Sequence, residues 1–226
     1  MLELHDMWEV LQMEIVRRIG QKIKSITNHL YNEREPKVDN PIYPNVRGSG
    51  LRIHLGAGPI NIQGWINIDA RDGSHIHLQS NRFDLKEFTA GGVSEIYMCH
   101  VLEHFSFEEV KTVLKTLHFK LRVGGVLRLS VPDFDQLIAI YQATGSDLEL
   151  IKRALMGGQE YEYNFHKTVF NKSLLSDLLI SCGFCHIQSW NTQDDFGIDL
   201  NDWSNKGFAT PRGNILVSLN LKAMKA

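Results

Sequence analysis

Short apolar runs alternate with stretches of helical periodicity along residues 51–226, and this alternation constrains the fold more than any other feature of the chain. Strands are predicted at residues 51–55, 65–69, 94–99, 126–131, 185–190 and 214–222, with a weaker candidate at 75–78. Helical segments fill most of the intervals, and two strands close the chain. This order predicts an α/β sandwich around a mostly parallel sheet.

Local capping signals place the helices. Ser106 and Glu109 have the spacing of a capping box, which predicts a helix that shares an apolar face up to Leu121 and stops at Gly124-Gly125. Further helices are predicted from Asp133 or Asp135 to about Thr144, up to Gly157-Gly158, and from Asn171 to Gly183.

Residues 1–35 have the periodicity of one long amphipathic helix, and residues 36–50, rich in proline and glycine, are interpreted as a linker to a domain at 51–226. The apolar stripe of the helix needs a covering surface: its own domain, the same helix of a second copy, or a membrane. Its other face mixes Glu14 with Arg17 and Arg18, whereas a helix on a membrane surface is more uniformly basic. Packing is therefore favoured, and a homodimer through this helix is one expectation.

The composition excludes several classes of protein. Of the 226 residues, 43% are apolar and 22% are charged, the usual balance for a soluble chain with a core. The net charge of −2 removes the counterion release that drives most nucleic-acid binding, so no nucleic-acid partner is expected. No apolar run reaches the about 18 residues of a membrane span, and the acidic N-terminus lacks the basic start of a signal peptide. Three cysteines are too few for a disulfide framework, so we expect a cytoplasmic protein.

The run His54-Leu55-Gly56-Ala57-Gly58 ends the first predicted strand, and Asp69 ends the second. Glycines directly after a buried strand let the backbone turn sharply beside a ligand, and a carboxylate ending the adjacent strand accepts hydrogen bonds from both hydroxyls of a ribose. The combination indicates an adenosine ligand at the carboxyl edge of the sheet, although a plain strand turn explains the glycines equally well. Pro59 and Ile60 stand where a dinucleotide fingerprint needs a third glycine and a helix, so NAD and FAD are disfavoured.

These residues resemble the class I S-adenosylmethionine-dependent methyltransferases, and in particular a bacterial subgroup of small predicted methyltransferases with the run LHLGxG…GWxNID. The likeness continues through residues 97–104 (YMCHVLEH), similar to the family's hVLEH, 121–127 (LRVGGVL), similar to LkpGGvl, and 166–171 (HKTVFN), similar to Hk..fn. It covers residues 51–222. It implies a Rossmann-like sandwich whose mostly parallel seven-stranded sheet has a terminal antiparallel strand, with the N-terminal helix added.

The resemblance also implies site residues. S-adenosylmethionine is the implied cofactor, with the turn Gly56-Ala57-Gly58 along its methionine and ribose part and Asp69 on the ribose diol. Asp84 is implied to accept a hydrogen bond from the adenine amino group, beside the backbone amide of Leu85, and His100 to lie where the sulfonium meets the substrate. Two plainer interpretations stay open: Asp84 as a helix cap, and His100 as a polar residue at a strand end.

Residues 100–104 also match H-x-x-E-H, a pattern in which two histidines one helical turn apart bind zinc and the glutamate activates water. Here His100, Glu103 and His104 follow a predicted strand, and the capping box starts the helix only after the motif. The two imidazoles would then not lie one helical turn apart. No metal ligand is therefore assigned, and a zinc hydrolase stays a lesser alternative.

Tyr161, Tyr163 and His166 lie between two predicted helices, in a stretch too polar for a core and too aromatic for a plain loop. His166 is therefore a candidate for the acceptor site, with a structural hydrogen bond as the alternative. The long segment 191–213 carries four aspartates and, in the methyltransferase topology, lies on the ligand edge. It either sets specificity or is simply solvated.

The sequence thus predicts an enzyme that moves a methyl group from S-adenosylmethionine to a small molecule. The resemblance suggests a sugar or another hydroxyl from a surface-polysaccharide or specialised-metabolite pathway as acceptor. A base with a pKa near neutrality helps when the acceptor is a hydroxyl, and His166 and His100 are the catalytic candidates. A non-catalytic cofactor-binding protein, whose N-terminal helix forms a partner interface, is the main alternative.

Overall fold

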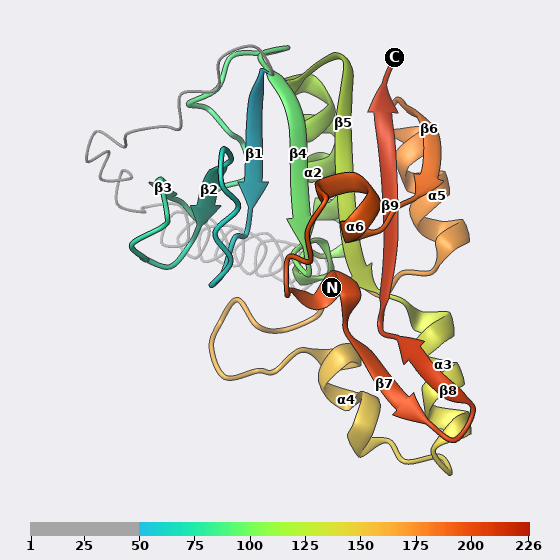
Figure 1. Ribbon diagram of the computed structural model, residues 1–226. Helices are drawn as coiled ribbons and strands as arrows, with labels where there is room; N and C mark the ends of the chain where they lie inside the picture. Colours follow the sequence, from blue (N-terminus) through green and yellow to red (C-terminus); the bar gives the residue numbers. More distant parts are fainter. Residues whose placement is uncertain (1–49) are drawn as a thin grey trace, which may run out of the picture. The chain divides into compact units, whose positions relative to one another are not determined.

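Seven strands pair in the order β3-β2-β1-β4-β5-β9-β6 in the computed structural model, which describes residues 50–226 (Figure 1). The strands are β1 (Leu51–Leu55), β2 (Ile66–Asp69), β3 (Leu78–Gln79), β4 (Val93–Cys99), β5 (Leu121–Pro132), β6 (Phe184–Ser189) and β9 (Ser218–Lys225). The first five run parallel, and β9 pairs antiparallel with both β5 and β6. The predicted sandwich with its terminal antiparallel strand is confirmed. The predicted helix at 1–35 and the linker up to residue 49 lie outside the described residues, so a homodimer through that helix stays a prediction.

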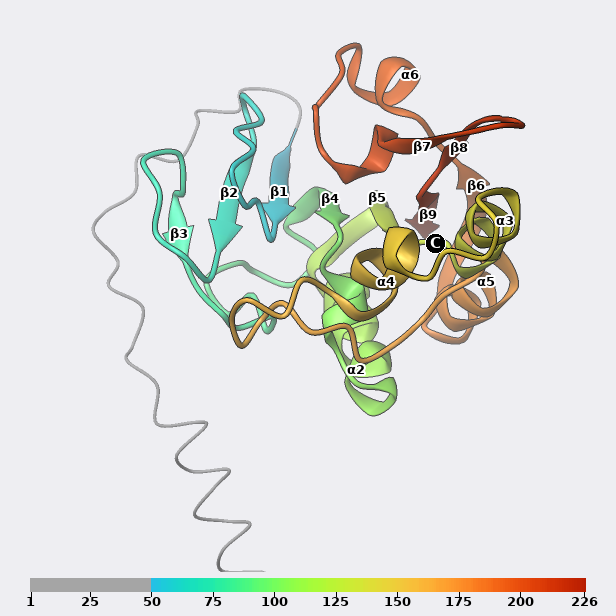
Figure 2. The same cartoon turned by 90° about the horizontal axis from the view of Figure 1, so that it is seen from below.

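Helices lie on both faces of the sheet (Figure 2). One face carries α2 (Phe107–Lys120) and α5 (Lys172–Ser181), and the other carries α6 (Thr192–Phe196). Below the sheet in Figure 1 lie α3 (Phe134–Ala143), α4 (Glu149–Met156) and the hairpin β7 (Gly207–Thr210) with β8 (Gly213–Leu216). Two 3-10 turns, η1 (Leu102–His104) and η2 (Trp203–Asn205), follow β4 and precede β7. Among residues 50–226 no helix is both long enough and apolar enough to cross a bilayer.

The capping signals act largely as predicted. The Ser106 amide donates to the Glu109 carboxylate at 2.8 Å, so the capping box opens α2 as expected. Asp133, rather than Asp135, caps α3, and Asn171 caps α5.

The end of α2 differs from the prediction. The helix stops at Lys120, and Leu121, predicted to be its last apolar residue, begins β5 opposite Val93. A side chain at Gly125 would place its Cβ 2.8 Å from the Arg122 carbonyl oxygen, so this glycine serves a close backbone approach inside the strand and not a helix stop.

The C-terminal segments are also more divided than predicted. The single strand expected at 214–222 is split at Val217, whose amide donates to the Lys206 carbonyl at 3.0 Å. On one side of this break β8 pairs with β7, and on the other β9 enters the main sheet. The segment 191–213, interpreted from the sequence as a specificity loop or a solvated segment, contains α6, η2 and most of the β7–β8 hairpin.

Candidate active site

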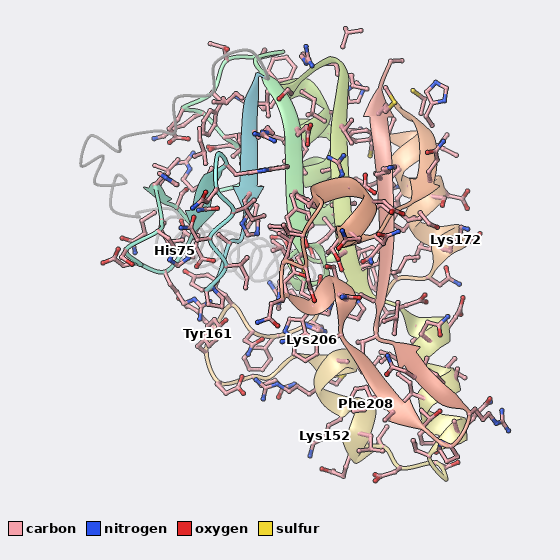
Figure 3. The ribbon with its side chains drawn as sticks, in the orientation of Figure 1. His75, Lys152, Tyr161, Lys172, Lys206 and Phe208 are labelled. Atoms are coloured by element: carbon pink, nitrogen blue, oxygen red, sulfur yellow. The ribbon has the colours of Figure 1, made fainter. Side chains whose placement is uncertain are left out.

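A cavity of about 910 Å³ opens at the carboxyl ends of β1, β2 and β4, a size that suits a small-molecule ligand. Its walls come from the turn after β1, the end of β4, the loop after α4 and residues 201–208. Figure 3 shows Tyr161, Lys206 and Phe208, which all line this cavity, below the sheet. Of the predicted site residues, the cavity brings together Gly56, Ala57, Gly58, Asp69, His100 and His166.

The turn after β1 is tied to the neighbouring strand. The amides of Gly56 and Ala57 both donate to the Ile68 carbonyl, at 2.8 and 3.0 Å. Gly56 has a φ of +73°, and a Cβ there would lie 2.2 Å from the Cγ2 of Val101. Both facts require glycine at this position, which explains the first residue of the motif in terms of backbone approach.

Asp69 faces the cavity from the end of β2. One carboxylate oxygen accepts a hydrogen bond from the Gly58 amide at 2.7 Å, and the other accepts from the Arg71 amide at 2.8 Å. The exposed Arg71 side chain also approaches that second oxygen, with its Nε at 3.5 Å. Each oxygen of a carboxylate has two lone pairs, so the oxygen bonded to Gly58 keeps one for a ribose hydroxyl, and the other oxygen gains one when the Arg71 side chain turns away. This arrangement fits the ribose of an adenosine ligand.

Asp84 and Leu85 lie apart from the cavity. The Asp84 carboxylate pairs with the Arg82 guanidinium and accepts from the Lys86 amide at 3.4 Å, while the Leu85 side chain is buried. Asn81 and Phe83, from the same segment, line the cavity instead. The predicted role of Asp84 at adenine stays a prediction.

His100 directly follows β4 and has a φ of 53°, an uncommon conformation for a residue with a side chain. Its ring stacks on Trp203 with 5.5 Å between the centroids, and its Nε2 lies 2.8 Å from the Ser218 hydroxyl. Burial is the main cause that lowers the pKa of His100 to about 3, and the positive charges of the nearby His166, His104 and Lys206 add to the shift.

His166 lies on the loop after α4 and also faces the cavity. Its Nδ1 lies 3.0 Å from the Ala154 carbonyl oxygen. Burial and the neighbouring His104 lower the pKa of His166 to about 4. Both imidazoles thus have pKa values below neutrality, because burial disfavours the charged ring, and the catalytic roles of His100 and His166 stay predictions.

Glu103 is the buried acid that the sequence interpretation considered only within the zinc pattern. Its side chain is fully buried, neither carboxylate oxygen has a hydrogen-bond partner, and burial raises its pKa to about 8. It lies on the 3-10 turn η1. As the sequence predicts, the H-x-x-E-H residues therefore do not form the α-helical turn of a zinc peptidase. The sequence signals for this residue are this motif and the family-like run YMCHVLEH, and neither assigns it a role at the site.

The loop after α4 reaches across the cavity to the segments that follow β2 and β3. The Arg71 guanidinium lies over the Tyr161 ring, 5.2 Å from its centroid, and the Asn81 amide donates to the Tyr163 hydroxyl at 3.3 Å. These contacts join residues more than eighty positions apart and let the loop cover part of the cavity.

Comparison with solved structures identifies this arrangement. A methyltransferase dependent on S-adenosylmethionine from Archaeoglobus fulgidus aligns with a TM-score of 0.50 and 14% identity, over 82% of this chain and 89% of that one. The described chain has the class I methyltransferase fold. No family model and no curated protein matches the sequence.

Two further methyltransferases align at lower scores. One from Methanosarcina mazei has a TM-score of 0.46 and 15% identity over 85% of this chain and 98% of that one. The 1,6-didemethyltoxoflavin N1-methyltransferase of Burkholderia thailandensis has a TM-score of 0.47 and 15% identity over 78% and 71%.

In this methyltransferase fold the segment 191–213 both anchors α6 to the sheet and forms part of the cavity wall. Asp195 is an anchor, since its carboxylate pairs with Arg128 at 3.2 Å and Lys222 at 2.7 Å beneath α6. Asp202 accepts hydrogen bonds from the Tyr97 hydroxyl at 2.5 Å and from the Ser204 amide at 2.9 Å, and Trp203 of the same 3-10 turn lines the cavity. The segment is therefore neither a simple solvated loop nor wholly a specificity loop.

Proposed function

We propose that the protein is an enzyme that transfers a methyl group from S-adenosylmethionine to a small-molecule acceptor. The observation that carries this proposal is that one cavity at the carboxyl edge of the sheet brings two groups of residues together. The glycine turn and Asp69 line one part of it, and His100, His104 and His166 line another. A cofactor and an acceptor would each have their own group of residues there.

The residues fit the cofactor on chemical grounds. The turn Gly56-Ala57-Gly58 admits a ligand close to the backbone, and Asp69 has acceptor capacity for a ribose diol. Asn81 and Phe83, which line the cavity, are better placed for the adenine end than Asp84 and Leu85.

When bound, S-adenosylmethionine supplies a methyl group whose bond to the positively charged sulfur breaks, with its electron pair left on sulfur, as an acceptor atom forms the new bond. The protein's part is to align the acceptor and to exclude water. The loop that carries Tyr161 and Tyr163, held to Arg71 and Asn81, is placed to exclude water.

The acceptor is proposed to be a hydroxyl of a sugar or of a related metabolite precursor, whose proton passes to His100 at the cavity wall or to water as the new bond forms. Supporting this, the outer cavity combines aromatic surfaces, such as those of Trp203 and Phe208, with charged side chains, such as those of Glu149 and Arg153. Polar rings bind well where apolar faces and a few polar groups meet.

Turnover separates this proposal from a protein that only binds the cofactor. The full chain would be incubated with S-adenosylmethionine labelled on its methyl group and with a small-molecule cell extract. We expect S-adenosylhomocysteine to form and the label to appear in a small molecule. Recovery of the labelled cofactor unchanged, from protein that binds it, would instead favour the non-catalytic alternative.

A further inference from the structure

Lone pairs converge on one buried point beside the cavity. His166 Nδ1 faces only the carbonyl oxygen of Ala154, at 3.0 Å, and a carbonyl cannot donate. In the neutral ring the hydrogen must therefore lie on Nδ1. The other nitrogen, Nε2, then carries a lone pair, and it lies 3.8 Å from Oε1 of Glu103.

His104 has a similar shortage of hydrogens. Its Nδ1 lies 3.1 Å from the Phe165 carbonyl oxygen, and its Nε2 lies 3.2 Å from the His100 carbonyl oxygen. A neutral imidazole carries one hydrogen, so one of these nitrogens must turn a lone pair toward a carbonyl oxygen. The nitrogen that carries the hydrogen is satisfied by its carbonyl oxygen. The nitrogen with the lone pair needs a partner that can accept this lone pair, such as a hydrogen-bond donor or a cation.

His100 adds a third case. The Ser218 hydroxyl donates its single hydrogen to the Trp203 carbonyl at 2.7 Å, so it must accept from Nε2 of His100 at 2.8 Å. The Nδ1 of His100 then carries a lone pair, and it lies 3.4 Å from Oε1 of Glu103.

Glu103 lies at the centre of these contacts. It is 0% exposed, and neither carboxylate oxygen has a hydrogen-bond partner. A protonated Glu103 would have a single hydrogen, which can meet only one of the two lone pairs, on His100 Nδ1 or on His166 Nε2. In either protonation state the cluster has more acceptors than hydrogens, and because buried polar groups are nearly always satisfied, this indicates a missing positive partner.

We propose that Glu103, His104 and His166 bind a divalent transition-metal cation at the floor of the cavity. One ligand atom from each residue lies within 4.8 Å of the others, and tetrahedral zinc holds such atoms about 3.3 Å apart, so modest side-chain rotations close the site. Two imidazoles and one carboxylate form a common transition-metal ligand set. The glutamate is a ligand here, unlike in a zinc peptidase, and His166 takes the place of His100.

The cation would have an open side toward the acceptor. His104 and His166 line the cavity, whereas Glu103 lies beneath them. Carbonyl groups on Nδ1 of both histidines fix the ring orientation, as outer partners of metal-bound histidines do. This role rests on the proposed function: an oxygen atom of the acceptor would bind the cation, which favours oxygen over an unactivated carbon as the methylated atom.

The test measures metal binding directly. Full-length protein freed of metal with a chelator would be titrated with Zn²⁺ against a chromophoric chelator, and with Co²⁺ while its visible absorption is recorded. We expect about one Zn²⁺ per chain and a cobalt spectrum typical of nitrogen and oxygen ligands. Glu103→Gln and His166→Gln should each weaken Zn²⁺ binding by about 100-fold or more. The matched control His118→Gln, on the far part of α2, should bind as the wild type does.

Two results would overturn the site. If the metal-free wild type binds no Zn²⁺ in the titration, the cluster is not a metal site, and a proton on Glu103 takes the place of the cation. If the wild type and both variants bind Zn²⁺ with equal affinity, the metal binds elsewhere. Should Glu103→Gln fail to fold by circular dichroism, His104→Gln and His166→Gln decide the question. Calorimetry with S-adenosylhomocysteine on the same metal-free protein tests the two proposals separately. If S-adenosylhomocysteine does not bind, the proposed function is contradicted, whereas the result on metal binding is unaffected.

Discussion

The carboxylate of Asp69 accepts a hydrogen bond from the main-chain amide of Gly58 at 2.7 Å, across the boundary between two neighbouring strands. The side chain proposed to bind the ribose therefore also fixes the turn that admits the ligand. One residue thus couples the shape of the site to its chemistry.

Asp69→Ala should weaken the binding of S-adenosylhomocysteine by about 2–3 kcal/mol, the scale of lost charge-assisted hydrogen bonds. Isothermal calorimetry measures this loss. Asp72→Ala is the control, because the exposed Asp72 carboxylate accepts only a local bond from the Gly73 amide. Unchanged affinity in a folded Asp69→Ala protein would contradict the assignment.

Gly56→Ala should destabilise the fold and reduce cofactor binding. Its φ of +73° disfavours any side chain, and the new Cβ would lie 2.2 Å from Val101. Gly124 has the same φ of +73° but open space around it, so Gly124→Ala measures the conformational cost alone. We expect the free energy of unfolding, from urea titration, to fall by about 1 kcal/mol for Gly124→Ala and by about 2–4 kcal/mol for Gly56→Ala. Equal losses would show that the contact with Val101 relaxes freely.

The sequence was most informative where a local rule acts alone. The Ser106 capping box and the Asn171 cap fixed the starts of two helices, because both depend on residues within one turn. The end of α2 was misplaced because Leu121 pairs with Val93, a residue almost thirty positions earlier, and that pairing outweighs the local glycine signal. Tertiary contacts overrule propensity in such cases.

The site divides in the same way. The glycine turn and Asp69 belong to consecutive strands, so their meeting follows from parallel pairing. Glu103 and His166 meet through hydrogen bonds between distant segments, among them those from the amides of Lys167 and Thr168 to the Glu103 carbonyl, at 2.8 and 3.2 Å. No local pattern encodes a contact between segments so far apart. Burial of that contact also moves the pKa values that the histidine assignment depended on.

Asp195→Ala should destabilise the protein by about 1–3 kcal/mol, because it leaves two cations without a shared partner. The Asp195 side chain is only 6% exposed and pairs with both Arg128 and Lys222. Asp194→Ala, at the exposed neighbour on the same helix, removes only the local hydrogen bond from the N-cap Asn191 at 2.6 Å and should cost less, about 0.5–1 kcal/mol. Urea titration of both variants makes the comparison, and equal effects would mean that α6 is not anchored through Asp195.

The stability of the fold should fall in acid, in part through His54. Burial lowers the pKa of His54 from 6.5 to about 4, against the opposing effects of its hydrogen bond to Asn67 and of the Asp202 and Asp69 carboxylates. The unfolded chain therefore binds a proton at this residue as the pH drops through 6.5, while the folded chain does so only near 4. The contribution of the neutral, buried His54 to the free energy of unfolding is therefore complete above pH 6.5, and it is lost as the pH falls from 6.5 to about 4.

His54→Gln removes that titration and keeps a side chain able to donate to Asn67. We expect the wild type to lose about 2–3 kcal/mol more than the variant when urea titrations at about pH 7.5 and pH 4.5 are compared. The other histidines with lowered pKa values, such as His100 and His166, contribute equally to both proteins, so the difference isolates His54. The measurement at the higher pH gives the packing cost of the substitution. Parallel losses in the two proteins would mean that His54 does not stay neutral in the folded state.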